Sequence, residues 1–207
     1  IIVITYFCGA PRLGRMFMEM LKERIRREGR VLNSDVLKVD SFLNHQVDPA
    51  LMRAIGEEFA RIFADANVTR VATIESSGIA PALYTAEYMN VPLLIMKKRG
   101  SRILDEDLVQ CEVKSFTKGN TYQLTASRHY ISPDDRVLVI DDFLAMGEAG
   151  MGACKLIESV GAKVAGIGAV IEKAFQPGHD KLIQAGYNLH SLARVSLMAP
   201  GEIEFVD

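Results

Sequence analysis

The stretch Arg136-Val-Leu-Val-Ile-Asp-Asp-Phe-Leu-Ala-Met-Gly-Glu-Ala-Gly150 determines how the rest of the chain is interpreted. Residues 137–140 are apolar, mostly β-branched and uncharged, which is typical of a strand buried on both faces of a parallel sheet. Two adjacent carboxylates, Asp141 and Asp142, end this apolar run. We therefore expect the strand to end at these two acids.

A loop of mostly small residues, 145–150, follows the acids and leads into a helical pattern that stops at Gly161. Free N–H groups at a helix start, with no bulky side chains around them, form an anion site. Carboxylates one loop away can hold sugar hydroxyls, directly or through the shell of a magnesium ion. This order predicts a site for a ribose 5-phosphate, although an ordinary strand-to-helix turn with an acidic cap would have the same pattern.

Composition limits the class of protein. At 207 residues the chain is long enough for one α/β domain, and 49% hydrophobic residues argue against extensive disorder. The formal net charge of −2 gives no electrostatic case for binding nucleic acid or an anionic membrane. Cys8, Cys111 and Cys154 share no metal-ligand spacing, so we expect reduced thiols and a cytoplasmic protein.

The first residues differ from the rest. Residues 1–10 are apolar but too short to span a bilayer, and no basic segment precedes them as in a signal peptide. An amphipathic pattern opens at Met18. We expect residues 1–17 to be an upstream extension, with a short edge strand as the alternative, and residues 18–207 to form a single domain.

Strand and helix patterns alternate along most of the chain, which predicts right-handed βαβ units and a parallel sheet. The predicted strands are residues 36–39, 70–75, 93–96, 137–140, 164–171, 189–197 and 203–206. The predicted helices are residues 19–28, 49–63, 81–90, 151–160 and 178–185. Ligands bind beyond the carboxyl ends of the strands in such sheets, so residues 75–78, 97–99 and 141–142 are where chemistry is expected.

The segment 100–120 breaks this alternation, because it is polar, charged and flanked by glycine. Residues 111–116 and 122–126 alternate in the manner of an antiparallel hairpin. We expect a mobile flap at about 100–130 that closes over the site and excludes water.

Residues 137–149 resemble the phosphoribosyl-diphosphate (PRPP) motif of the type I phosphoribosyltransferases: four apolar residues, two acids, two apolar residues and a small phosphate loop. The variant Asp-Asp-Phe-Leu-Ala at 141–145 is most similar to the bacterial xanthine-specific members, and the resemblance covers Met18 to about Val206. It implies an α/β fold with a central parallel sheet flanked by helices. A small hood, built from about 18–48 and 173–207, and a flexible flap complete this fold.

The resemblance also implies roles for the motif residues. Asp141 and Asp142 would engage the ribose 2- and 3-hydroxyls during catalysis. The 5-phosphate of PRPP would be cradled by Ala145, Met146, Gly147, Glu148 and Ala149.

The phosphate loop departs from the family pattern at two positions. The resembling enzymes carry Asn-Gly-Gln where this chain has Met146-Gly147-Glu148. Backbone N–H donation survives any side chain, so the loop can still bind phosphate. The Glu148 carboxylate, however, would oppose a phosphate dianion by about 1–3 kcal/mol unless it points to solvent.

Two further strand ends are candidates for binding the pyrophosphate group of PRPP. Ser76, Ser77 and Gly78 resemble the family's pyrophosphate loop, whose backbone N–H groups meet the leaving group, although serine and glycine are also ordinary turn residues. Lys97, followed by Lys98 and Arg99, would neutralise the pyrophosphate; a solvated strand end is the alternative.

Base recognition is also implied by the resemblance. Lys173, in an Ile-Glu-Lys motif, would meet an exocyclic oxygen, and because lysine offers only donors this favours a 6-oxopurine over adenine. Phe143 or Phe175 would stack on the base, with core packing as the alternative. Leu37 and Asn44 lie in residues 36–45, which resemble the hood over the base, and the resemblance implies that Asn44 reads the second carbonyl of the base. Without the resemblance, Leu37 would be a core residue and Asn44 a turn residue.

The expected function is that of a pentosyltransferase in purine salvage: PRPP and xanthine give xanthosine 5-monophosphate (XMP) and pyrophosphate. The implied cofactor is Mg²⁺ held mainly by PRPP, with no metal ligand assigned to the protein, and the implied assembly is a homodimer. The alternatives are another 6-oxopurine enzyme using guanine or hypoxanthine, a non-catalytic PRPP-sensing regulator that binds DNA, and some other nucleotide-binding α/β domain.

Overall fold

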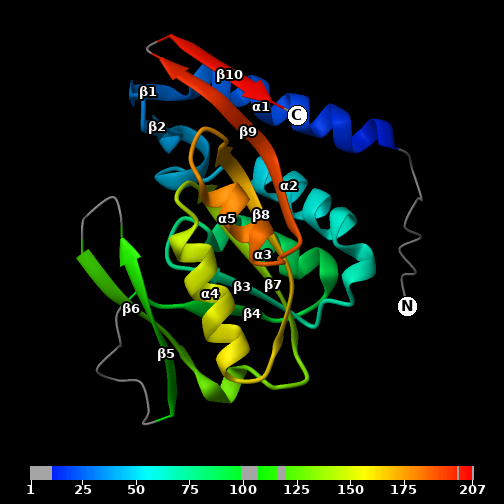
Figure 1. The fold of residues 1–207 in the computed structure, drawn as a ribbon. Coiled ribbons are helices and arrows are strands. Elements are labelled where there is room, and N and C mark those ends of the chain that lie inside the picture. The colour runs from blue at the N-terminus through cyan, green and yellow to red at the C-terminus, as the bar shows by residue number, and fades with distance from the viewer. Residues whose placement is uncertain (1–10, 99–106, 116–119, 200, 207) are drawn as a thin grey trace, which may run out of the picture.

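The computed structural model describes residues 11–98, 107–115, 120–199 and 201–206. Its centre is a six-stranded sheet in the order β10-β9-β8-β7-β3-β4 (Figure 1). The strands from β9 to β4 are parallel, and β10 pairs antiparallel with β9 at one edge. The bounds are β3 Arg70–Ile74, β4 Leu93–Met96, β7 Arg136–Leu144, β8 Lys163–Lys173, β9 Leu189–Ala199 and β10 Glu202–Val206. The predicted α/β fold with a mostly parallel sheet is confirmed.

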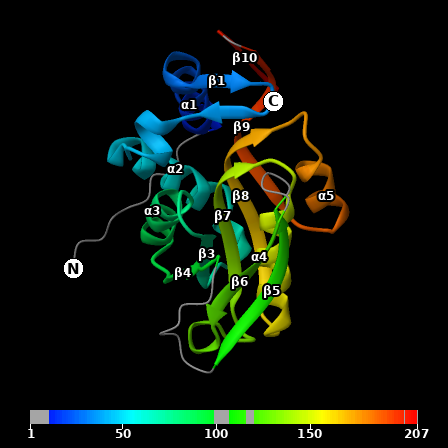
Figure 2. The ribbon, with the colours of Figure 1, turned by 90° about the vertical axis from the view of Figure 1, so that its left-hand side faces the viewer.

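Helices cover both faces of this sheet, as expected for a strand such as β7 that begins with an apolar run. Leu138 and Ile140 face one core with α2 (Pro49–Ile62) and α3 (Ile79–Met89). Val137 and Val139 face the other core with α4 (Glu148–Ser159) and α5 (Gly178–Gln184). Figure 2 shows the two layers on opposite sides of the sheet. The start of α2 follows its sequence signal, since the Asp48 side chain accepts from the N–H groups of Ala50 and Leu51.

Two boundaries at the centre differ from the sequence prediction. The strand β7 does not stop at the acids but continues to Leu144, because its pairing with β8 runs as far as Leu144 and Glu172. On the other side β3 accompanies β7 only as far as Val139. The acids therefore lie inside a strand that is paired along one edge and open along the other. The following helix begins at Glu148, so residues 148–150 of the expected loop are helical.

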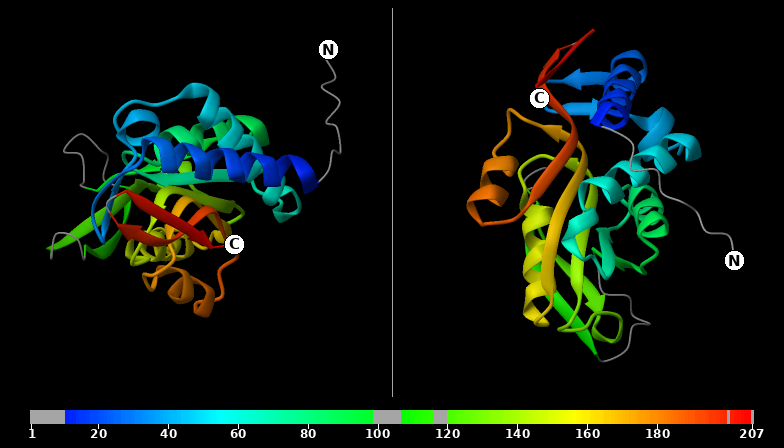
Figure 3. Two further views of the ribbon diagram at one scale, coloured as in Figure 1. Left: turned by 90° about the horizontal axis from the view of Figure 1, so that it is seen from above. Right: turned by 90° about the vertical axis from the view of Figure 1, so that its right-hand side faces the viewer.

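The hood lies at one end of the sheet (Figure 3). It contains α1 (Pro11–Glu28), the antiparallel pair β1 (Arg30–Asn33) and β2 (Val36–Lys38), and a π-helical turn at Asp40–Asn44. The α1 helix packs on β10, where Arg26 lies 4.9 Å from the centre of the Phe205 ring.

Two features of the hood differ from the sequence prediction. The strand β1 was not predicted. The helix α1 begins at Pro11, inside the expected extension, and Phe17 packs against the core. The alternative edge strand, residues 1–10, lies outside the described residues.

The predicted hairpin is present as β5 (Leu108–Ser115) and β6 (Asn120–Ser127). Its described strands are part of the core: Val113 is buried, and a Cβ added to Gly152 of α4 would lie 2.3 Å from the Val113 Cγ2 atom. An isolated bridge between Lys97 and Thr125 joins the hairpin to the strand end of β4. Most of the expected flap tip, residues 99–106 and 116–119, lies outside the described residues, so closure stays a prediction.

None of the described helices combines the length and the apolar character needed to cross a membrane.

Candidate active site

The two acids lie at the carboxyl end of β7, next to the loop that precedes α3. A Cβ added to Gly78 would lie 3.1 Å from the Asp141 Oδ1 atom and 2.3 Å from the Thr73 Oγ1 atom. A residue larger than glycine would push this loop away from the acids. The fold thus brings Asp141 and the predicted pyrophosphate loop, residues 76–78, to one place.

The two carboxyl groups influence each other. The Asp142 N–H donates to Asp141 Oδ1 over 3.0 Å. Burial first, and the neighbouring Asp142 carboxylate second, raise the pKa of Asp141 well above its usual range, while the positive charge of Lys98 acts in the opposite direction. Asp141 therefore holds a proton more strongly than an exposed aspartate does. Hydroxyl or cation ligands, which interact with the ionised form, would release that proton.

The lysines after β4 have different positions. The Lys97 Nζ atom lies 3.4 Å from the Glu75 carboxylate, which also accepts from the Lys98 N–H over 2.9 Å. The Lys97 ammonium therefore sits beside Glu75, directly before Ser76. Lys98, which was not predicted to act on the acids, carries a positive charge that only partly opposes the rise in the pKa of Asp141.

A tyrosine that was not predicted lies on the hairpin near the acids. Burial, followed by the negative charge of Asp141, raises the pKa of Tyr122 on β6. No local pattern indicated this residue, because its proximity to Asp141 depends on the packing of the hairpin against the core.

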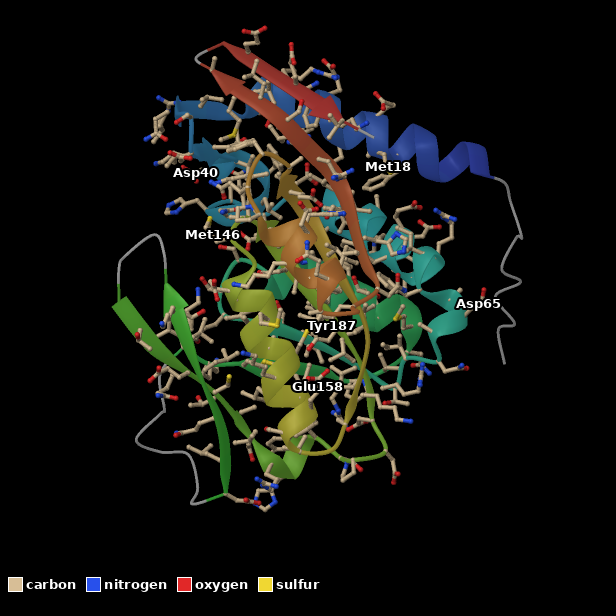
Figure 4. All side chains as sticks on the ribbon, in the orientation of Figure 1. Met18, Asp40, Asp65, Met146, Glu158 and Tyr187 are labelled. Atoms are coloured by element: carbon tan, nitrogen blue, oxygen red, sulfur yellow. The ribbon has the colours of Figure 1, made fainter. Side chains whose placement is uncertain are left out.

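The phosphate loop is a tight turn into α4. Gly147 has φ +79°, in the left-handed region, and provides no side chain to cap the helix that begins at Glu148. The first N–H groups of a helix have no acceptor within the helix, so they are available to an anion. The predicted loop residues Ala145, Met146 and Ala149 surround this helix start. Figure 4 shows Met146 near the start of α4, beside the hood that carries Asp40.

The loop lies directly on α5. The Gly178 N–H donates to the Ala145 carbonyl over 3.0 Å, and a Cβ on Gly147 would lie 3.0 Å from the Gly178 Cα atom. The Glu148 carboxylate is ion-paired with Lys181 of α5. The sequence left two possibilities for Glu148, namely that its carboxylate opposes the phosphate or that it points to solvent. The structure shows a third, in which the Lys181 ammonium balances the charge of the carboxylate.

A buried carboxylate at the end of β8 holds α5 in place. Glu172 is fully buried, and its oxygens accept from Ser191 (2.6 Å) and Arg194 (2.9 Å) and lie 3.0 Å from His179 Nδ1. Burial alone would raise the pKa of Glu172, but these hydrogen bonds lower it overall. The structural role of Glu172 was not predicted. A glutamate directly after the apolar run of a buried strand such as β8 could have indicated a buried charge with hydrogen-bond partners.

The predicted base-binding residues come from three segments that the fold brings together. Lys173, the last residue of β8, donates to the carbonyl of Asp35 and lies 5.6 Å from the centre of the Phe143 ring. The Asn44 side-chain amide donates to Asp142 over 3.3 Å. Burial lowers the pKa of Lys173, and the charges of Asp35 and Asp142 partly oppose this. Asn44, Phe143 and Lys173 are thus neighbours of the acid pair.

The other two residues named for the base, Leu37 and Phe175, differ in exposure. The Leu37 side chain is buried in the hood core, where a Cβ on Gly29 would lie 3.2 Å from its Cδ1 atom. Phe175 is an exposed residue, and Phe143 occupies the place beside Lys173. The contact between Lys173 and the Asp35 carbonyl was not predicted, because the position of a backbone carbonyl cannot be inferred from residue types.

Within the part of the chain that the structure describes, no group of three or more His, Cys, Asp or Glu side chains is arranged to hold a metal ion.

The chain is similar in sequence to known phosphoribosyltransferases. Residues 43–183 match the phosphoribosyl transferase domain family. A xanthine phosphoribosyltransferase from Exiguobacterium sp. is 55% identical, over 92% of this chain and 98% of the relative. Xanthine phosphoribosyltransferase 1 from Clostridium botulinum (strain Hall) is 56% identical, over 91% of this chain and 100% of the relative.

The solved structures share the fold at low identity. Adenine phosphoribosyltransferase from Thermoanaerobacter pseudethanolicus superposes with a TM-score of 0.70 at 22% identity, covering 84% of this chain and 99% of that one. The corresponding enzyme from Trypanosoma brucei gives 0.71 at 17% identity, covering 84% and 79%. With the family match over most of its length, the chain belongs to the type I phosphoribosyltransferase family.

Proposed function

We propose that the protein is a xanthine phosphoribosyltransferase, which transfers the 5-phosphoribosyl group of PRPP to xanthine and yields XMP and pyrophosphate. The observation that carries the proposal is the convergence at the carboxyl end of β7. There Asn44 donates to Asp142, Lys173 lies over the Phe143 ring next to the acid pair, and the helix-start loop follows directly along the chain. Relatives that are 53–56% identical over nearly the whole chain carry the same name.

The ribose and phosphate half of the site provides positioning and charge. The N–H groups at the start of α4 hold the 5-phosphate, and Asp141 and Asp142 accept from the ribose hydroxyls. As pyrophosphate leaves, positive charge develops at the ribose ring, and the two carboxylates next to it stabilise that charge. No covalent nucleophile is required, because the reaction depends on the alignment of two bound substrates.

Magnesium is part of this proposal as a companion of PRPP. The acid pair and the hydroxyls of Ser76 and Ser77 are hard oxygen donors of the kind that Mg²⁺ prefers. When bound, the ion would neutralise charge on the pyrophosphate, while most of its ligands would come from PRPP.

The base half selects by hydrogen bonding. Lys173 has only donors, so it fits the 6-oxygen of an oxopurine and leaves the amino group of adenine without an acceptor. In this proposal the Asn44 amide reads the second carbonyl that distinguishes xanthine from hypoxanthine. Both side chains have protein partners, the Asp35 carbonyl and Asp142, which the base would replace.

The proposal also includes the cytoplasm as location, purine salvage as role and a homodimer as assembly. The free thiols of Cys111 and Cys154 support a reducing compartment. Membership of the family supports the dimer, which sedimentation velocity measures directly.

A product assay tests the proposal. The protein is incubated with PRPP and Mg²⁺ and with xanthine, guanine, hypoxanthine or adenine in separate reactions, and the nucleotides are separated by chromatography. We expect XMP to be the dominant product. A preference for guanine or hypoxanthine would keep the transferase and overturn the base assignment, and the absence of product from every base would contradict the function as a whole.

A further inference from the structure

The short helix α5 is in contact with the phosphate loop at three points. Its first residue, Gly178, donates its N–H to the Ala145 carbonyl over 3.0 Å. Gly178 also packs against Gly147, so closely that a Cβ on either glycine would lie within 3.0 Å of the other residue's backbone. One helical turn later, Lys181 forms an ion pair with Glu148. The loop and α5 therefore form one packed unit.

The position of α5 is fixed from the opposite side as well. His179 lies 3.0 Å from the buried Glu172, whose remaining partners Ser191 and Arg194 belong to β9. Leu182 is fully buried in the core beside α4. Since the residues on either side of it are held in this way, Lys181 is presented to Glu148 from a rigid support.

The location of Glu148 gives this ion pair a consequence for binding. Glu148 is the first residue of α4, so its own N–H belongs to the group that meets the phosphate. A carboxylate at that position repels a phosphate dianion, and a cation in contact with it cancels the repulsion. The side chains of Glu148 and Lys181 are only 24% and 37% exposed, which limits the screening of both charges by water.

We propose that Lys181 is part of the phosphate-binding machinery: by neutralising Glu148 it allows a loop that carries a carboxylate to bind the 5-phosphate of PRPP. The proposal deepens the proposed function and rests on it for the identity of the ligand. It makes Lys181 a positioning and charge-balancing residue, acting through Glu148 without contacting the phosphate itself.

A double-mutant cycle with ribose 5-phosphate as the probe tests this inference, because binding of the probe requires neither the base nor catalysis. We expect Lys181→Gln to weaken ribose 5-phosphate binding about 10-fold at low ionic strength. In the Glu148→Gln background the same substitution should change the affinity by less than about twofold, since no carboxylate remains to be neutralised. Lys181→Arg should restore most of the affinity.

The matched control is Lys163→Gln, which also removes one positive charge. Lys163 is an exposed lysine at the start of β8, whereas α5 follows the other end of that strand. The affinity of this control for ribose 5-phosphate should equal that of the wild type, and ribose without phosphate should show no difference among the variants. Thermal melting of each variant verifies folding, and Lys181→Met provides a second neutral replacement.

Two results would overturn the inference. One is a Lys181→Gln affinity equal to that of the Lys163→Gln control. The other is an equal loss of affinity in the wild-type and the Glu148→Gln backgrounds, which would mean that Lys181 does not act through Glu148. Neither result affects the proposed function, which the product assay decides separately.

Discussion

The two halves of the site are built in different ways. The ribose and phosphate half comes from one continuous segment, residues 141–150, and its loop rests on α5 through Gly178 and Lys181. The base half is assembled from separate parts of the chain, and its polar groups are paired with other protein groups, Lys173 with the Asp35 carbonyl and Asn44 with Asp142. The first half is therefore formed before any ligand arrives, whereas the proposed base-binding side chains would have to exchange partners when a base binds.

The largest effect is expected where the two halves meet. Replacing both acids, Asp141→Asn with Asp142→Asn, should lower kcat/KM for PRPP at least ~100-fold, because the developing positive charge loses both carboxylates. Thermal stability should be unchanged or higher, since two like charges are removed. The control is Asp134→Asn, an exposed aspartate at the other end of β7. A loss below about 10-fold would assign the acids a structural role.

Two glycines with positive φ allow the effect of the phosphate loop on binding to be distinguished from the effect of backbone strain on stability. Gly147 (φ +79°) faces the Gly178 backbone, whereas Gly186 (φ +89°) has nothing within 4 Å of an added Cβ. Alanine at either position should lower the free energy of unfolding by about 1–2 kcal/mol, because both glycines use the left-handed region. Only Gly147→Ala should also raise KM for PRPP, by about 10-fold.

Chemical denaturation and initial-rate kinetics on both glycine variants make this comparison. If Gly186→Ala raised KM for PRPP equally, the close contact between the loop and α5 would have no part in binding.

Substitutions in the base half should change the selectivity of the enzyme among purine bases. Asn44→Ala should lower kcat/KM for xanthine by a factor equivalent to about 1–3 kcal/mol of transition-state stabilisation and leave kcat/KM for hypoxanthine, which has no second oxygen, nearly unaffected. Lys173→Gln should weaken the binding of both bases and leave KM for PRPP nearly constant. Its control is Lys155→Gln, on the exposed side of α4. Equal losses for xanthine and hypoxanthine with Asn44→Ala would remove Asn44 from base recognition.

The smallest effect is a proton linkage at the acid pair. The raised pKa of Asp141 means that its neutral form stabilises the fold. This contribution is complete below the ordinary aspartate pKa of about 3.9, and it is lost as the pH rises through the raised value. Ligands that need the ionised carboxylate therefore release a proton, and their affinity falls as the pH falls through that value.

Calorimetry of PRPP binding in two buffers with different ionisation enthalpies measures this proton release. Asp142→Asn should reduce it, because the neighbouring charge that raises the Asp141 pKa is gone. A binding enthalpy independent of the buffer would contradict the linkage.

The sequence predicted the local structural features of the candidate site and missed what depends on tertiary contact. The acid pair, the turn at Gly147 and the cap at Asp48 follow from short-range chemistry, and all are present. The extension of β7 beyond the acids depends on its pairing with β8, which no local pattern records. Two contacts were missed because they join residues far apart in sequence: the hydrogen bond from Lys173 to the Asp35 carbonyl, and the ion pair between Lys181 and Glu148.

The resemblance named candidate residues for the base half but not their partners in the fold. Asn44 and Lys173 lie beside the acids, while the Leu37 side chain belongs to the hood core. Only the fold shows that Asn44 and Lys173 are occupied by protein partners.

A crystal structure of the protein with XMP tests the arrangement of both halves at once. We expect the 5-phosphate to accept from the N–H groups of residues 145–149, at about 3 Å, and the Lys173 ammonium to leave the Asp35 carbonyl for the 6-oxygen of the base. The ribose hydroxyls should meet Asp141 and Asp142. A phosphate bound away from the start of α4, or a base that leaves Lys173 on Asp35, would contradict the proposed site.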